Sequence, residues 1–156
     1  MAREHEQEAR NKALVLEAFD TLFNRRDFEA AERYFPAGYI QHSAGIGPGR
    51  DGLFALVRSV HRQYESAQAI AEGDYVMVHG RFSGGGRPTR IAVDILRIDG
   101  GRLAEHWDVI QDEATRAESK SGLPMFGDRF PERELDAKVD GVLAAAAGQA
   151  PDTKAP

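Results

Sequence analysis

Residues 103–111 read LAEHWDVIQ, and in this stretch ionisable groups and the protein's single tryptophan lie among aliphatic residues. The aliphatic residues favour a strand, although the stretch also holds Glu105, His106 and Asp108. Placing a charge among apolar residues costs free energy unless the charge is paired or neutralised. Ionisable groups in such surroundings concentrate at functional sites. His106 and Asp108 are therefore candidate site residues.

A second strand precedes this one and is expected to form a hairpin with it. Arg90 to Ile98 holds Asp94 inside the apolar run IAVDIL and is followed by a short Asp-Gly-Gly connection. A three-residue loop with its last glycine in the left-handed conformation would place Asp94 opposite His106, with Asp108 further along the same face and Trp107 on the other. A two-residue turn would shift the register by one residue and separate the carboxylate from the imidazole. We favour the three-residue loop.

Towards the N-terminus the apolar residues repeat with a helical period. This pattern predicts an amphipathic helix from about Glu8 to Asn24. Asp27 is the expected N-cap of a short second helix, which Pro36 and Gly38 end, and a third helix is expected from about Asp51. The faces formed by this spacing carry Leu14, Val15, Ala18, Phe19, Leu22, Phe23, Phe28, Ala31, Tyr34, Phe35, Leu53, Phe54, Val57, Val60, His61 and Tyr64.

After residue 65 the apolar period changes from helical to two. Residues 75–82 alternate and predict a strand, and residues 66–70 predict a weaker strand before it. Three helices followed by about four antiparallel strands indicate an α+β fold. We assign residues 1–127 to a single domain and residues 128–156 to a C-terminal extension, with a short helix around residues 135–143 and then a disordered tail.

Composition narrows the class of protein. With 156 residues, 42% hydrophobic and 29% charged, the chain has the make-up of an ordinary globular domain. A net charge of -5 without a basic cluster argues against nucleic acid as a partner. The absence of cysteine excludes disulfides, thiol nucleophiles and cysteine-ligated metals. Without a secretory signal or a long apolar segment, we expect no membrane association and a cytoplasmic location.

Several motifs in the chain resemble one known family. They are YIQH at residues 39–42, the glycine-rich loop that leads into Gly52, VDI at residues 93–95, and EHWDVIQ at residues 105–111. Together with the helix-first order, they resemble the SnoaL-like polyketide cyclase family of the nuclear transport factor 2-like (NTF2-like) superfamily, which also holds ketosteroid isomerase, scytalone dehydratase and limonene epoxide hydrolase. The resemblance covers about residues 9–126.

The resemblance implies a cone-shaped α+β fold, in which about three helices pack on a strongly curved antiparallel sheet and close a pocket. Members commonly form homodimers through the outer face of the sheet. Polyketide cyclases of this type close a ring by intramolecular aldol condensation without a metal or an organic cofactor. An aspartate on the last long strand is held to act as acid and base, and Asp108 is the matching position here. His42 matches a polar residue at the pocket mouth of relatives.

Aldol closure requires a proton to be removed from a carbon next to a carbonyl group. Aspartate in water is a weak base, but burial raises its pKa and suits it to proton transfer near neutral pH. Ketosteroid isomerase divides the work between one aspartate as base and another that stays protonated as a hydrogen-bond donor. We therefore expect Asp108 to act as base, with Asp94 or His42 polarising a small hydrophobic carbonyl compound. Cyclisation, isomerisation and dehydration would all use this chemistry.

Other interpretations remain open for individual residues. Asp108 could be a structural carboxylate paired with an arginine such as Arg90. Trp107 is more often a core or dimer-interface residue than a platform for substrate. Four residues are expected to contact the substrate, although the last three are most simply core residues: His106, Tyr39, Phe54 and Met77.

The site as a whole has two further interpretations, a metal site and a non-catalytic binding site. His42, His106 and Asp108 have the chemistry of a zinc or iron site. Nothing in the sequence brings His42 near the other two, so we expect neither a metal nor another cofactor. The same cone could also belong to a non-catalytic protein that binds a small apolar molecule, because a fold does not decide function.

Overall fold

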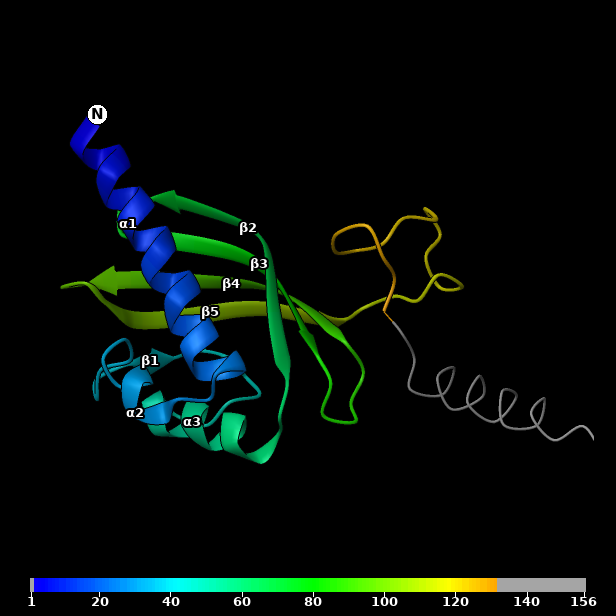
Figure 1. The fold of residues 1–156 in the computed structure, drawn as a ribbon, viewed down its shortest axis with the longest axis horizontal. Coiled ribbons are helices and arrows are strands. Elements are labelled where there is room, and N and C mark those ends of the chain that lie inside the picture. Colours follow the sequence, from blue (N-terminus) through cyan, green and yellow to red (C-terminus); the bar gives the residue numbers. More distant parts are fainter. Residues whose placement is uncertain (1, 132–156) are drawn as a thin grey trace, which may run out of the picture.

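The computed structural model describes residues 2–131 of the chain. In Figure 1, helices pack against a single curved sheet, so the α+β prediction is confirmed. The elements follow the order α1 (Ala2–Phe19), η1 (Asp20–Asn24), α2 (Phe28–Ala31), β1 (Ile40–Gln41), α3 (Gly49–Ser59), β2 (Gln63–Glu72), β3 (Tyr75–Ser83), β4 (Arg90–Asp99) and β5 (Arg102–Asp112).

The first helix starts earlier than predicted but ends where expected. α1 begins at Ala2 rather than near Glu8, and the π-helical turn η1 continues it to Asn24. The side chain of Asn24 donates a hydrogen bond to the carbonyl of Tyr64 (3.1 Å) and accepts one from its backbone N–H (2.8 Å). This pair of bonds ties the end of the long helix to the start of β2.

The two short helices follow local signals in the sequence. Asp27 caps α2 as predicted, because its Oδ1 accepts a hydrogen bond from the backbone N–H of Ala30 (3.0 Å). α3 begins at Gly49, slightly before the predicted Asp51, and buries Leu53, Phe54 and Val57. The predicted continuation to His61 and Tyr64 was wrong, because the helix ends at Ser59, the backbone of Val60 is extended and Tyr64 belongs to β2.

The sheet contains five strands in the order β1-β5-β4-β3-β2. The long strands β2 to β5 pair antiparallel with their neighbours. β1 was not predicted, because two residues are too short to show a period. Its residues Ile40 and Gln41 pair in parallel with Glu105 and His106 at the edge of the sheet. The segment between α2 and α3 is thereby held beside the candidate strand β5.

The β4–β5 connection differs from the predicted loop. Gly100 and Gly101 both have positive φ (55° and 72°) and form a two-residue turn between Asp99 and Arg102. Such a turn suits glycine at both central positions. The prediction of a three-residue loop was wrong.

A β-bulge compensates for the shorter turn. Ile98 pairs with Leu103, whereas Arg97 pairs with Glu105, so Ala104 is an extra residue on β5. The register beyond the bulge is shifted by one residue.

Asp94 therefore pairs with Asp108, and the predicted direct pairing of Asp94 with His106 was wrong. Because two shifts of one residue add to an even number, Asp94, His106 and Asp108 still share one face of the sheet. Their predicted grouping is confirmed, although turn length alone would have separated them.

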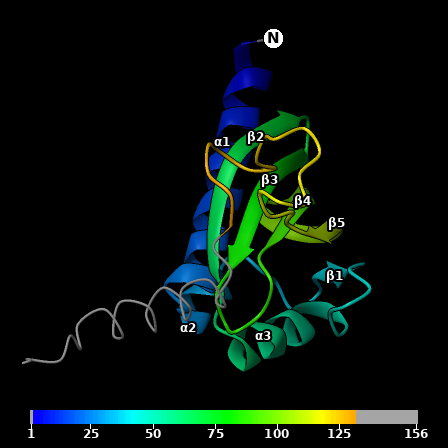
Figure 2. The ribbon, with the colours of Figure 1, turned by 90° about the vertical axis from the view of Figure 1, so that its right-hand side faces the viewer.

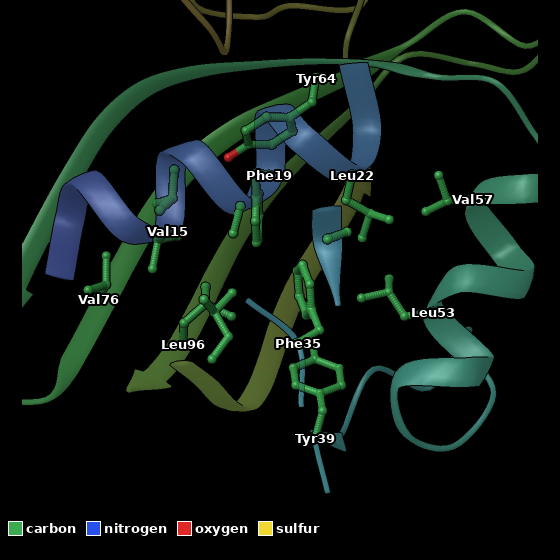
Figure 3. Close-up of a cluster of buried hydrophobic side chains, with 14 of the residues drawn as sticks. Val15, Phe19, Leu22, Phe35, Tyr39, Leu53, Val57, Tyr64, Val76 and Leu96 are labelled. Carbon is green, nitrogen blue, oxygen red and sulfur yellow. The ribbon is translucent and has the colours of Figure 1, made fainter. Parts of the chain in front are cut away.

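The core lies between the helices and the inner face of the sheet. Figure 3 shows Val15 and Phe19 from α1 near Val76 and Leu96 from the sheet, Leu22 on the side of Leu53 and Val57 from α3, and Phe35 and Tyr39 below them. Several of these side chains are completely buried. A domain of this size needs such a core, because apolar burial contributes about 25 cal/mol per Å².

One glycine in the core is required by a close approach. A Cβ on Gly80 would lie 2.5 Å from Cε2 of Tyr64, so the tyrosine ring crosses β3 only because that residue has no side chain. The Tyr64 ring packs against Phe19 and Phe82.

The outer face of the sheet carries a second buried cluster and a group of exposed apolar residues. Residues 113–131 follow β5, and the guanidinium of Arg81 joins them to β3 through Glu113 and the carbonyl of Phe126. Figure 2 shows this segment beside β2 and β3. Elsewhere on the outer face of the sheet, the exposed apolar side chains are Ile70, Tyr75, Met77, Val93 and Val109.

Across residues 2–131, no helix has both the length and the apolar character needed to cross a membrane. The predicted C-terminal helix around residues 135–143 and the predicted disordered tail lie outside the described residues.

Candidate functional site

A cavity of about 530 Å³ lies between the helices and the inner face of the sheet. Its walls are mostly apolar, and Phe19, Phe35, Leu53, Val57 and Ile110 contribute to them. The polar groups that reach it include Asp94, His106 and Asp108, which come from the paired strands β4 and β5. An apolar cavity with a few convergent polar groups is the usual form of a small-molecule site.

Asp94 and His106 form a buried pair at this cavity. The His106 Nε2 lies 3.0 Å from Oδ1 of Asp94, and both side chains are almost completely buried. The two residues are diagonal rather than direct neighbours across the β4–β5 ladder, a distance that long side chains can bridge.

Gln41 determines how His106 holds its protons. The Gln41 Oε1 accepts a hydrogen bond from the backbone N–H of Ser43 (2.8 Å), which identifies that atom as the oxygen. The same oxygen lies 2.8 Å from Nδ1 of His106, so Nδ1 must carry the proton in this contact. In the neutral imidazole, Nε2 is then left as an acceptor. A single proton is therefore shared between Nε2 and the carboxyl group of Asp94.

The environment of Asp94 favours the protonated acid. Burial raises the pKa of Asp94; the hydrogen bond and charge of His106 oppose this rise, and the nearby charge of Asp108 adds to it. Its second oxygen, Oδ2, is buried and has no hydrogen-bond partner within residues 2–131. A buried oxygen with unused hydrogen-bonding capacity beside a cavity can serve a bound molecule.

Two tyrosines add buried phenol groups near Asp94. Tyr39 lines the cavity, and its hydroxyl oxygen accepts a hydrogen bond from Nε2 of Gln41 (3.3 Å). Burial, reinforced by the nearby charge of Asp108, raises the pKa of the Tyr39 phenol. Burial also raises the pKa of Tyr64, whose hydroxyl has no partner in the described part of the chain. Both phenols therefore stay protonated.

Asp108 is the free carboxylate of the site. It is partly buried and lines the cavity, and it forms no hydrogen bond or ion pair with the described residues. The proposed alternative, a structural pairing with Arg90, is wrong, because Arg90 binds Asp112 instead (3.0 Å). A carboxylate of this kind can accept a proton from a bound molecule.

The same residues have the composition of a cation site. One ligand atom from each of Asp94, His106 and Asp108 lies within 4.8 Å of the others. This is a different trio from the one considered on sequence grounds, because Asp94 takes the place of His42. The imidazole Nε2 that would bind a metal is engaged by Asp94.

His42 does not face the other candidate catalytic groups. The residue borders the cavity, but its Nε2 lies 2.8 Å from Oε1 of Glu105 and its ring stacks on Trp107 at 4.9 Å. Glu105 and Trp107 project from β5 on the face opposite Asp108, because strand side chains alternate. The expected role of His42 in polarising the substrate is not supported by this orientation. Gln41 faces His106 from β1, and the next residue in the chain therefore faces the other way.

Two of the expected substrate contacts also need correction. Met77 lies on the outer face of β3, where it is 43% exposed, and does not line the cavity. Phe54 is buried in the core against Phe28 and Phe35, and it does not line the cavity either. Tyr39 and His106 do line it, as expected.

Sequence reasoning missed several polar residues at the cavity. Gln41 stood in a quoted motif, but its contact with His106 depends on the parallel pairing of β1 with β5. Arg62, Arg87 and Arg90 also line the cavity. In the sequence, Arg87 and Arg90 belong to the β3–β4 loop and its end, a pattern equally typical of solvent-exposed loop residues, and only tertiary contacts bring Arg62 to them.

Comparisons with solved structures agree with this fold. A proposed ketosteroid isomerase from Kribbella flavida has a TM-score of 0.61 and 18% identity, with 80% of this chain and 97% of the other covered. A proposed polyketide cyclase from Acidithiobacillus ferrooxidans has a TM-score of 0.56 and 18% identity over 65% and 88% of the two chains. An LEH-like epoxide hydrolase from M. tuberculosis has a TM-score of 0.56 and 16% identity over 92% and 99%. These likenesses show a common NTF2-like fold.

Sequence comparison is decisive for the family. No curated protein matches the chain. The SnoaL-like domain family, however, matches residues 15–106, which run from the last part of α1 to His106 in β5. The resemblance found in the motifs is thereby confirmed, and the chain belongs to the SnoaL-like domain family.

Proposed function

We propose that this protein is a small enzyme that moves protons on a hydrophobic carbonyl compound, in an aldol-type cyclisation, an isomerisation or a dehydration. The observation that carries the proposal is the pairing of a free carboxylate, Asp108, with a proton-holding pair, Asp94 and His106, at one apolar cavity. One group is ready to accept a proton and the other holds one.

The proposed reaction begins at Asp108. Its carboxylate takes a proton from the carbon next to the substrate carbonyl, and the electron pair of the broken C–H bond moves to form an enolate. The proton shared by Asp94 and His106 neutralises the oxygen that gains charge. In an aldol closure, the enolate carbon instead attacks a second carbonyl, and the shared proton goes to the new alkoxide. In an isomerisation, Asp108 gives its proton to another carbon of the substrate, and the enol oxygen returns the second proton to Asp94 and His106. In an aldol closure, the proton held by Asp108 passes to Asp94 and His106, whose atoms lie within 4.8 Å of it, and this transfer restores both groups.

Gln41 and Tyr39 act on this chemistry indirectly. Gln41 holds the proton on Nδ1 of His106 and so keeps Nε2 turned to Asp94. Tyr39 gives the cavity a neutral phenol beside the same cluster. General acid–base catalysis of this kind contributes on the order of a hundredfold to ten-thousandfold in rate.

Exchange of hydrogen for deuterium on a bound ketone tests the first step without knowledge of the natural substrate. Bicyclic ketones such as tetralone and decalone are incubated with the protein in D2O, and loss of the α-proton signal is followed by NMR. The wild-type protein should accelerate exchange of at least one ketone. Asp108→Asn should lower the acceleration about a hundredfold or more, because the amide is not a base.

Matched controls separate the possible outcomes. His5→Gln changes an imidazole on the exposed surface of α1 and should leave exchange unchanged. Addition of EDTA should also leave it unchanged, whereas a loss would favour metal chemistry at Asp94, His106 and Asp108. Exchange that persists in Asp108→Asn would contradict the proposal. Ketone binding without accelerated exchange would favour the non-catalytic binding protein.

We also propose that the protein forms a homodimer through the outer face of the sheet. Val109 is 70% exposed there and Ile70 is 60% exposed, which is unfavourable for isolated apolar side chains in water. Light scattering should give twice the chain mass, and Val109→Asp should shift it to the monomer. A monomeric wild-type protein at micromolar concentration would contradict this assembly.

A further inference from the structure

Three arginines reach the cavity at a distance from the aspartates. Arg62 follows α3, Arg87 lies in the β3–β4 loop and Arg90 begins β4, and all three line the cavity. They converge because Arg62 donates hydrogen bonds to the carbonyls of Phe82 and Pro88, both 3.3 Å long, at the two ends of that loop. Residues from three parts of the chain thus place guanidinium groups around one mouth.

The strands set the separation between this mouth and the aspartates. Arg90 pairs with Asp112, while Asp94 pairs with Asp108 in the same ladder. The two pairs are four residues apart, which corresponds to about 13 Å along the strands. On the β5 side of this interval, Ile110 lines the cavity between Asp108 and Asp112. A single small molecule with an apolar middle can reach from one end to the other.

The mouth carries more positive than negative charge. Arg90 is paired with Asp112 at 3.0 Å, but the contacts of Arg62 are backbone carbonyls. Arg87 makes no hydrogen bond or ion pair with any residue in the range 2–131. Burial lowers the pKa of Arg62, and the positive charges of Arg90 and Arg87 lower it further, whereas the charge of Asp112 raises it. An anion in this mouth would relieve that repulsion.

We propose that Arg62, Arg87 and Arg90 form an anion subsite, which binds a carboxylate or phosphate group of a substrate whose carbonyl end lies beside Asp108. Guanidinium groups match both anions, because their planar N–H donors form paired hydrogen bonds with two oxygens. The orientation follows from charge, since an anionic end is repelled by the carboxylate of Asp108. This inference rests on the proposed function for the orientation of the substrate, but the subsite itself is defined by binding alone.

Matched acid and amide probes test the subsite by calorimetry. Naphthylbutanoate and naphthylbutanamide share an apolar body and differ in charge, and naphthylbutyl phosphate extends the comparison to phosphate. The wild-type protein should bind the carboxylate about tenfold more tightly than the amide, and less tightly as salt is added. A stronger preference for either anion would identify which group the mouth is built to hold.

Two variants and one control assign this preference to the arginines. Arg87→Gln removes a side chain without contacts to the described residues, so it should fold normally and weaken carboxylate binding about threefold to fivefold. The triple change of Arg62, Arg87 and Arg90 to Gln should abolish the preference. Arg102→Gln removes the same charge at the far hairpin and should have no effect. Amide binding should stay constant in all three proteins.

The outcomes distinguish this inference from the proposed function. Equal binding of acid and amide, no binding of either, or a preference that survives in Arg87→Gln and in the triple variant would overturn the anion subsite. Asp108→Asn should keep the preference for the carboxylate, since it leaves the arginines intact. If the wild-type protein fails to exchange ketone protons but keeps the preference, the proposed chemistry falls and the subsite stands.

Discussion

Two buried ionic clusters lie on opposite faces of the same sheet, and they differ in how completely their atoms are paired. On the outer face, Arg81 and Glu113 have side-chain exposures of 5% and 0%; on the inner face, His106 and Asp94 have exposures of 6% and 5%. Burial is therefore the same. The outer cluster, however, is closed, whereas the inner one keeps an oxygen of Asp94 without a partner.

The outer cluster uses its hydrogen-bonding capacity within the fold. The guanidinium of Arg81 donates from Nε and Nη2 to the two oxygens of Glu113, and Nη2 also reaches the carbonyls of Phe126 and Arg129. The ring of Phe126 lies 4.5 Å from the guanidinium carbon. This cluster fastens residues 113–131 to the sheet. The comparison teaches that a buried charge marks a site only where its capacity for hydrogen bonds is left open to a cavity.

The largest expected loss of stability comes from a change that breaks the outer cluster. Arg81→Met leaves the carboxylate of Glu113 buried without a partner, and such a loss costs about 3–5 kcal/mol. Denaturant unfolding should show this decrease in the free energy of unfolding. Arg10→Met, which breaks the exposed pair of Arg10 with Glu6, should cost less than about 0.5 kcal/mol. Equal costs for the two changes would contradict the structural role of the outer cluster.

The second largest effect is expected from loss of the hydrogen bond between Gln41 and His106 in the inner cluster. Gln41→Leu removes the acceptor of the His106 Nδ1 proton, and an unsatisfied buried donor costs about 1–3 kcal/mol. Nitrogen NMR should show Nδ1 protonated in neutral His106 of the wild-type protein and a change of tautomer in the variant. Gln63→Leu is the matched control, because it removes a Gln–His contact at the surface. An unprotonated Nδ1 in the wild-type protein would refute the proton assignment.

The pH dependence of the free energy of unfolding tests the protonation of Asp94 in the inner cluster. The pKa of Asp94 is raised in the folded protein by burial, so the group contributes stability that is present below its unfolded pKa and is lost as pH rises through the folded pKa. Relative to Asp94→Asn, the wild-type protein should lose stability with rising pH in that window, by at most about 1.4 kcal/mol per pH unit. Chemical unfolding at a series of pH values measures the difference. Asp112→Asn, an exposed carboxylate, should run parallel to the wild-type protein.

The smallest expected effect on stability comes from Glu105, which contacts His42 and Arg97 on the outer face of the sheet. The hydrogen bond from His42 and the contact with Arg97 lower the pKa of Glu105. A lowered pKa contributes stability that is present above the unfolded pKa and is lost as pH falls through the folded one. Glu105→Gln should therefore flatten the acid side of the stability profile slightly. Carbon NMR of the wild-type carboxyl should show a midpoint below 4.5, and a midpoint above it would contradict the contacts.

Much of the fold could be predicted from local patterns. The helix ending at Asn24, the Asp27 cap and the division of β5 into two faces all follow from residues close in sequence. Asp94 and Asp108 were found in the same way, because each stands among apolar neighbours. Met77 and His42 were misplaced, because their faces depend on strands whose position in the sheet is not local.

The β4–β5 hairpin shows most clearly where prediction from sequence ends. Alternation within β5 determined that His106 and Asp108 would share one face of that strand. Alternation within β4 likewise assigned Asp94 to one face of its own strand. Tertiary structure decided that these sides coincide, because the extra residue Ala104 offsets the two-residue turn. It also placed Gln41 beside His106 from 65 positions away. Side-chain period is a property of one strand, whereas register and proton sharing depend on how separate strands pack.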